Sequence, residues 1–91
     1  MNYVINEASA GFEEKNDAFI TVKPAKKDFG TLINLKSSVE KQYGTHIKNL
    51  ISKILREKNY TDVIVDIIDK GAWDYTLIAR LVTALERGNL K

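Results

Sequence analysis

The sequence predicts a small α+β domain, in which a mostly antiparallel sheet with an N-terminal hairpin has two helices packed on one face. Three observations lead to this fold class. A chain of 91 residues is long enough for one hydrophobic core and too short for two. Several short segments are rich in β-formers, and two long segments repeat apolar residues every three or four positions. Their order along the chain is β-β-β-α-β-α.

The first expected element is a hairpin. Residues 18–23, AFITVK, are rich in β-formers and alternate between two faces, so they predict a strand. Pro24 has no amide hydrogen to donate and is expected to end this strand. A weaker strand over residues 8–13 completes the hairpin across the polar tip AGFEEKND, residues 10–17.

Two more strands are expected further along the chain. Residues 31–36, TLINLK, alternate with a period of two, which is typical of a strand. The run DVIVDII, residues 62–68, is nearly continuous in branched aliphatic residues. Such a run predicts a strand that is covered on both faces and lies centrally in the sheet.

The longer helix is expected over residues 37–59. Ser37 and Glu40 form the pattern of a capping box, in which the hydroxyl and the carboxylate each accept a hydrogen bond from a free backbone amide. Behind this box a single apolar stripe recurs at intervals of three and four residues: Val39, Tyr43, Ile47, Leu50 and Ile54.

The second helix is expected over residues 73–88, WDYTLIARLVTALERG. Arg87 lies in the last turn, where a positive charge complements the helix dipole. Gly88 suits the C′ position that follows a helix. The buried face is predicted by large apolar residues at a spacing of four: Trp73, Leu77, Leu81 and Leu85.

Composition narrows the classes of function. A net charge of +2 with scattered lysines does not predict a nucleic-acid partner, because such proteins gather basic residues on one face. The absence of cysteine excludes disulfides and cysteine nucleophiles, and a single histidine excludes a multi-histidine metal site. The N-terminus lacks a signal-peptide pattern, and no apolar stretch approaches the ~20 residues that span a bilayer. We therefore expect a soluble cytoplasmic domain without a membrane partner.

Few side chains indicate chemistry on their own. His46 borders the apolar stripe of the first helix, and the sequence nominates neither a nucleophile nor an orienting acid for it, so we interpret it as structural. Asp66, Asp69 and Asp74 offer oxygen ligands, but their spacing fits no cation-binding loop, and Asp69 suits a turn or a helix cap. No glycine-rich phosphate loop is present. We expect a chain that catalyses nothing alone and works while bound by partners.

A family pattern spans most of the chain. The segment DKGAWDYTLIAR, residues 69–80, resembles the Asp-Lys-Gly-Ala-Leu-Asp…Ala-Arg signature of the citrate lyase acyl carrier protein family, the γ subunit of that enzyme. Residues 35–51 resemble the family's segment of Ser, Val, Gln, an aromatic-Gly pair and an aliphatic helix. Residues 8–11 and the strand AFITVKP also correspond, so the resemblance covers roughly residues 8–87.

The resemblance implies a carrier that is not itself an enzyme. In the family, a phosphoribosyl-dephospho-CoA arm is joined through a phosphodiester to a serine at the hairpin tip, and its thiol holds acetyl or citryl groups as thioesters. A large α subunit exchanges acetate for citrate on that thiol. A β subunit then cleaves the citryl thioester to oxaloacetate and the acetyl carrier. An exposed tip on a rigid domain suits an arm that must reach two active sites.

The tip of this chain departs from the family pattern. The family tip reads Ala-Gly-x-Leu-Glu-Ser-Ser-Asp, whereas this chain has Lys15 at the position of the modified serine, then Asn16 and Asp17. The resemblance therefore places the attachment site at residues that bear no hydroxyl, and no serine or threonine occurs between Ser9 and Thr21. Milder departures are Trp73 and Tyr75, where the family has smaller residues.

Three hypotheses follow from these observations. The chain is a citrate-lyase-type carrier with a diverged tip, whose attachment point is another residue such as Ser9 or the Lys15 amine. Alternatively, it is a carrier-derived subunit without the prosthetic group, which acts as a structural or regulatory binding module in a lyase-like complex. The third hypothesis is an unrelated small binding module, for instance for nucleic acid.

Overall fold

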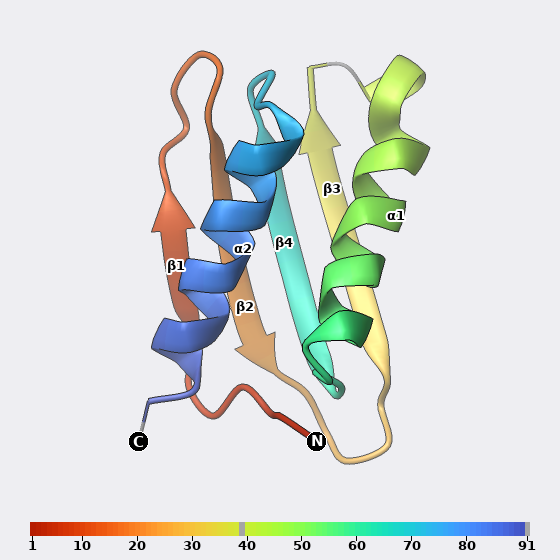
Figure 1. Cartoon of the computed structure of the whole chain (residues 1–91), viewed down its shortest axis with the longest axis vertical. Helices are drawn as coiled ribbons and strands as arrows, with labels where there is room; N and C mark the ends of the chain where they lie inside the picture. Colours follow the sequence, from red (N-terminus) through yellow and green to blue (C-terminus); the bar gives the residue numbers. More distant parts are fainter. Residues whose placement is uncertain (39, 91) are drawn as a thin grey trace.

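The computed structural model describes residues 1–38 and 40–90, and of Glu40 only the backbone. The observed order of elements is the expected β-β-β-α-β-α (Figure 1). The strands and helices are β1 (Ala8–Gly11), β2 (Ala18–Pro24), β3 (Thr31–Ser37), α1 (Glu40–Glu57), β4 (Val63–Asp69) and α2 (Asp74–Gly88).

The four strands form one mixed sheet in the order β1-β2-β4-β3. The pairs β1–β2 and β2–β4 are antiparallel, and β3–β4 is parallel. The parallel pair arises because α1 returns the chain to the starting end of β3 before β4 begins, as parallel neighbours require. The expected α+β class with a mostly antiparallel sheet is confirmed, and the central position of β4 is confirmed as well.

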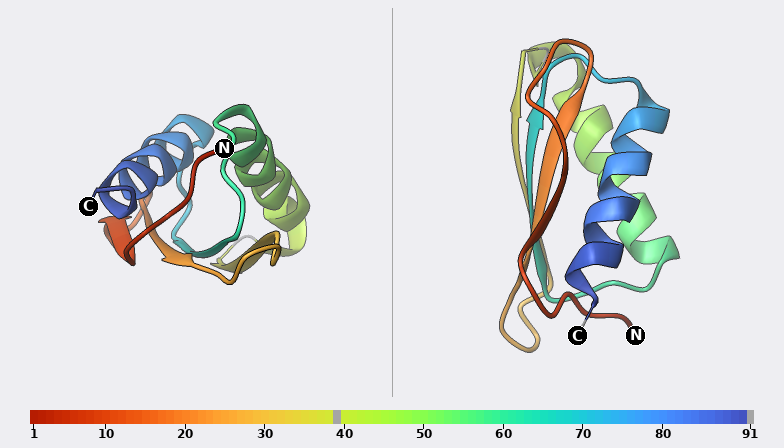
Figure 2. Two further views of the ribbon diagram at one scale, coloured as in Figure 1. Left: turned by 90° about the horizontal axis from the view of Figure 1, so that it is seen from below. Right: turned by 90° about the vertical axis from the view of Figure 1, so that its left-hand side faces the viewer.

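Both helices cover the same face of the sheet, as expected (Figure 2). Helix α2 packs on β1 and β2, while α1 packs on β3 and along α2. The expectation that both faces of β4 are covered is wrong. Its residues alternate strictly between buried and half-buried, because only the helical face is covered. The open face accepts apolar side chains such as Ile64 and Ile68 in a half-buried state.

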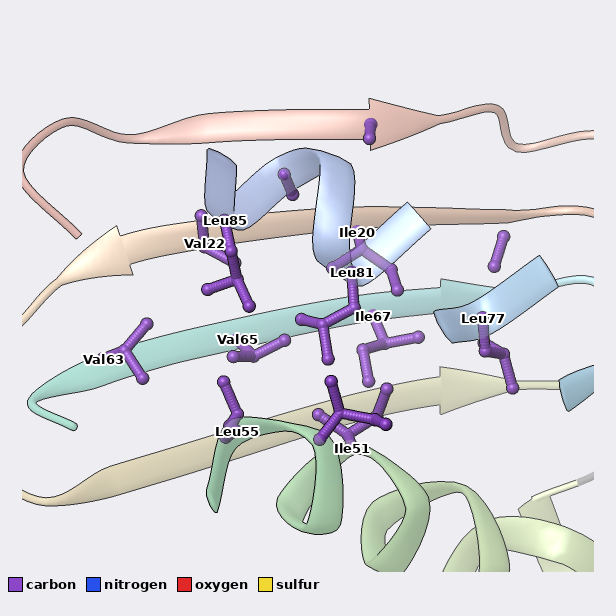
Figure 3. Packing of buried hydrophobic residues seen from close by; sticks show 14 of the residues in the cluster. Ile20, Val22, Ile51, Leu55, Val63, Val65, Ile67, Leu77, Leu81 and Leu85 are labelled. Atoms are coloured by element: carbon purple, nitrogen blue, oxygen red, sulfur yellow. The ribbon is translucent and has the colours of Figure 1, made fainter. Parts of the chain in front are cut away.

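The core lies between the sheet and the two helices (Figure 3). Alternate residues of β2 and β4 point into it, and every third or fourth residue of each helix meets them. The largest fully buried apolar side chains are Ile20, Val22, Ile51, Leu55, Val63, Val65, Ile67, Leu77, Leu81 and Leu85.

The buried stripe of α1 is rotated from the predicted one. Ile51 and Leu55 are fully buried, whereas Tyr43 is 55% exposed. The pattern of apolar residues allows two overlapping stripes, and contact with the sheet selects one of them. Ser37 ends β3 rather than beginning the helix, and its hydroxyl donates to Asp69 Oδ2 at 2.7 Å. The other half of the predicted capping box, the Glu40 side chain, lies outside the described residues, as does Val39.

Two details of α2 correct the predictions. Trp73 precedes the helix and is 67% exposed, so it is not part of the buried face. Gly88 is the last helical residue rather than the C′ residue. A Cβ atom there would lie 2.9 Å from the carbonyl oxygen of Asn6 and 3.0 Å from Val4 Cγ1, so the glycine permits close packing of the N-terminal segment. Within the described residues, neither helix is long and apolar enough to cross a membrane.

Candidate functional site

The candidate site is the hairpin tip, defined here as residues 12–17 between β1 and β2. It lies at the end of the molecule opposite both termini, beside the β4–α2 loop and the start of α2 (Figure 1). Residues 12–16 are exposed, and Asp17 is half-buried. Of the predicted site residues, Lys15 and Asn16 therefore lie on an accessible surface, whereas the Asp17 side chain is largely shielded.

A tight turn forms the outer part of the tip. The amide of Asp17 donates to the carbonyl of Glu14 at 3.0 Å, which makes Lys15 and Asn16 the two central residues of a β-turn. Asn16 has a φ of 64°, a left-handed conformation that asparagine tolerates better than most residues. Lys15 consequently lies at the corner of the turn.

The inner part of the tip is joined to the β4–α2 loop. The amide of Asn16 donates to the carbonyl of Lys70 at 2.8 Å, and the amide of Lys70 donates to the carbonyl of Asp17 at 2.9 Å. Because Asn16 and Asp17 both lie opposite Lys70, these backbone bonds form a β-bulge just beyond the last paired residues, Ala18 and Asp69. The tip is thus fixed to the core of the fold.

An ion pair fixes the tip to helix α2. Arg80 donates from Nε to Asp17 Oδ1 at 3.0 Å and from Nη2 to Asp17 Oδ2 at 2.8 Å. The Asp17 side chain is only 17% exposed, and the Arg80 side chain is 34% exposed. The hydrogen bonds from Arg80 and from the Ala18 amide lower the pKa of Asp17. The Arg80 guanidinium also lies 5.9 Å from the centre of the Phe12 ring, within cation–π range.

The β4–α2 loop owes its shape to the first residues of the 69–80 signature. Asp69 is 1% exposed, and its carboxylate accepts from the Ala72 amide at 2.9 Å and from the Ser37 hydroxyl at 2.7 Å. Gly71 has a φ of 88°, a conformation that costs side-chain-bearing residues energy. With Lys70 and Arg80 bonded to the tip, the signature acts as the support of the hairpin tip.

The tip offers no hydroxyl to which a phosphodiester could be attached. Lys15 and Asn16 are the exposed residues at its corner, and neither bears one. The alternative attachment residue, Ser9, lies in β1, where its half-buried hydroxyl is 3.0 Å from the Thr21 hydroxyl. The residues present therefore do not fit the arm that the family resemblance implies.

An open groove of about 540 Å³ lies between the helices at the same end of the molecule. Three exposed aromatic residues line it: Tyr43, Trp73 and Tyr75. His46 and Asp74 join α1 to α2 beside them, with His46 Nε2 and Asp74 Oδ2 2.8 Å apart. His46 thus has an acidic partner that the sequence did not indicate. Because both side chains are 55% exposed, the pair serves as a surface contact between the helices.

The three aspartates considered as cation ligands lie apart. Asp66 is on the open face of the sheet, bonded to Lys23 at 3.0 Å and to the Asn34 amide at 2.8 Å. Asp69 shapes the β4–α2 loop, and Asp74 pairs with His46. Among the residues that the structure describes, no three acidic or histidine side chains form a metal-binding group.

The two-layer scaffold with an exposed, anchored hairpin tip is what the resemblance to a carrier subunit implies. Comparison with known proteins agrees. A family model described as "Malonate decarboxylase delta subunit (MdcD)", of the acyl carrier type, matches residues 5–88. The citrate lyase acyl carrier protein of Latilactobacillus sakei is 44% identical over 81 residues, which is 89% of this chain and 78% of the relative. That of Halothermothrix orenii is 44% identical over 82 residues, 90% of this chain and 85% of the relative.

The chain belongs to the citrate lyase acyl carrier protein family. A solved structure, the malonate decarboxylase hetero-tetramer of Pseudomonas in complex with malonate, contains a chain with the same fold. The TM-score is 0.77, with 19% identity, over 94% of this chain and 87% of that chain. The resemblance found in the sequence is thus confirmed.

Sequence reasoning missed the residues that hold the tip. Arg80 ends the family signature and Asp17 ends the tip, but they lie 63 residues apart, and nothing local indicates that they pair. Phe12 and Lys70 were missed for the same reason. The sequence offers one signal: the family signature ends in Arg80 and the tip pattern ends in Asp17, two residues of opposite charge.

Proposed function

We propose that this chain occupies the place of the acyl carrier subunit in a citrate-lyase-like complex, with large α and β lyase-type subunits as its partners. The observation that supports this most is the anchored tip, together with membership of the carrier family. In that place the chain alone catalyses nothing, and the complex is cytoplasmic. Neither nucleic acid nor a membrane is among the partners.

The geometry of the tip suits docking against a large partner. Its backbone is bonded to the β4–α2 loop, and its last side chain is bonded to α2. A surface that is already ordered loses little conformational entropy on binding. The neighbouring groove presents Trp73 and Tyr75, 67% and 72% exposed, and exposed aromatic residues of this kind are enriched at protein interfaces.

Relatives of the family present acetyl and citryl thioesters on a covalent arm, as the resemblance implies. The corner of this tip bears a lysine and an asparagine instead of a hydroxyl. The proposed role is therefore assembly with the partners through the tip end, without a covalent arm on the natural chain.

Co-purification tests the proposal. A tagged chain would be co-expressed with the large lyase-type subunits of the same organism and isolated through its tag. We expect both subunits in the isolated complex, and weaker recovery with Trp73→Ala in the groove. The matched control is Leu32→Ala, an exposed apolar residue of β3 on the open face of the sheet, which should not alter recovery. A folded chain that recovers neither subunit, or that converts citrate by itself, contradicts the proposal.

A further inference from the structure

We propose that the Lys15 side chain alone prevents covalent loading of this chain, and that the rest of the tip is retained in a form that a Lys15→Ser substitution makes competent for loading. This inference rests on the proposed function, because it treats the tip as a carrier tip in a lyase-like complex. It goes beyond that function by identifying Lys15 as the residue that leaves the natural chain without a covalent arm.

Backbone contacts single out position 15 as the presented residue of the tip. Within the tip, the amide of Asp17 bonds the carbonyl of Glu14, and the amide of Asn16 and the carbonyl of Asp17 bond Lys70. The Asp17 side chain is bonded to Arg80. Within the described part of the chain, the Lys15 side chain makes no hydrogen bond or ion pair. A side chain at position 15 is therefore held by a fixed backbone and extends into solvent.

Nothing in these contacts depends on a lysine. The turn is closed by backbone groups, the left-handed residue is Asn16, and the ion pair uses Asp17 and Arg80. Exchanging the exposed Lys15 for serine should leave the fold unchanged, since surface substitutions away from special contacts shift stability by only about 0.5 kcal/mol. A serine hydroxyl would then occupy the corner of the turn.

The hydroxyls of Ser9 and Ser37 on the sheet do not serve as attachment points in place of a hydroxyl at position 15. Ser9 is half-buried beside Thr21, and the carbonyl of Ser9 accepts from Arg87 Nη1 at 2.8 Å. The Ser37 hydroxyl donates to the buried Asp69 carboxylate, which shapes the β4–α2 loop. Attachment at Ser9 would break its contact with Thr21, and attachment at Ser37 would break the bond to Asp69 that helps to shape the β4–α2 loop.

The chemistry explains why a lysine does not substitute for the serine. To form a phosphodiester, a hydroxyl oxygen attacks the phosphorus of an arm that carries a phosphate-type leaving group. A new O–P bond forms, the bond to that leaving group breaks, and the hydroxyl proton passes to a base. An amine at the same place would give a P–N bond, which is a different product. An acyl group on the lysine amine would be an amide, which is far less reactive toward transfer than a thioester.

Intact-mass measurement tests the inference. The natural chain, Lys15→Ser and the matched control Glu14→Ser would each be produced in Latilactobacillus sakei, whose own citrate lyase acyl carrier protein is a relative of this chain. The mass of the host's own carrier, measured in the same cells, shows that the arm is being attached. We expect a gain of several hundred daltons for Lys15→Ser, located on residue 15 by peptide mapping, and the polypeptide mass alone for the other two.

Three results would overturn the inference: a loaded natural chain, a loaded Glu14→Ser chain, or a Lys15→Ser chain that stays unloaded and folded beside a loaded host carrier. The large lyase-type subunits of this chain's own organism would be co-expressed in the same cells, and their recovery with each variant separates this inference from the proposed function. Loading of Lys15→Ser without recovery of any subunit supports the inference and contradicts the proposed function. Recovery of the subunits without loading of Lys15→Ser supports the proposed function and contradicts the inference.

Discussion

Replacing Asp17 with asparagine removes one charge from the ion pair that joins the tip to α2, while keeping the size of the side chain. The asparagine oxygen can still accept from the Ala18 amide, which now donates to Asp17 Oδ1 at 2.7 Å. The bond from Arg80 Nε, at 3.0 Å, can remain on the amide oxygen without its ionic character, whereas the bond from Nη2, at 2.8 Å, is lost because an amide NH2 cannot accept it. The substitution therefore removes the charge and one hydrogen bond of the anchor.

The size of the effect follows from the burial of the pair. Hydrogen bonds to charged groups contribute about 1.5–3 kcal/mol, whereas fully exposed ion pairs contribute about 0–1 kcal/mol. Asp17 is 17% exposed and Arg80 is 34% exposed, so the pair lies between these limits. We expect Asp17→Asn to lower the free energy of unfolding by about 1.5 kcal/mol, which corresponds to a fall in Tm of roughly 6–12 °C for a domain of this size.

Urea unfolding as a function of pH is the assay. Arg80 lowers the pKa of Asp17 in the folded chain below its ordinary value of 3.8. The stabilisation is therefore complete above the pKa of the unfolded chain and is lost as the pH falls through the folded pKa. The difference between the natural chain and Asp17→Asn should be constant near neutral pH and shrink below about pH 4.

The matched control is Asp66→Asn. The Asp66 side chain is more exposed than that of Asp17, and it contacts Lys23 and Asn34 on the open face of the sheet. This control should destabilise the chain less than Asp17→Asn does. Equal losses for the two variants, or a loss at Asp17 that does not change between pH 7 and pH 3, would refute the reasoning that a shielded ion pair anchors the tip. Hydrogen exchange at residues 12–17 should increase in Asp17→Asn alone.

Two further predictions concern the core. Gly88→Ala should lower the free energy of unfolding by about 1–3 kcal/mol in thermal unfolding, because the new Cβ would lie 2.9 Å from the Asn6 carbonyl oxygen. This overpacking outweighs the better helix propensity of alanine. An unchanged or higher Tm would contradict the prediction. Ile51→Ala, at a fully buried position of α1, should cost about 2–5 kcal/mol in urea unfolding, and a loss no larger than that of the exposed Leu32→Ala would argue against the observed stripe.

The sequence predicted the elements well where the pattern was local. Alternation in residues 18–23 and 31–36 identified β2 and β3, and the spacing of Leu77, Leu81 and Leu85 identified the buried face of α2. Errors arose at places where a pattern allowed more than one geometry. The stripe of α1 is an example, since Tyr43 and Ile51 both fit a helical repeat and only contact with the sheet distinguishes them.

What the sequence by itself determined is the α+β class, the order of the elements, the hairpin tip and the absence of a hydroxyl at Lys15 and Asn16. These properties depend on residue identity and on neighbours within a few positions of the chain. Only the tertiary structure decided that β3 and β4 are parallel and that Arg80 anchors Asp17 across 63 residues. Such contacts join segments that are distant in sequence, and their energy depends on distance and burial, which no local pattern contains.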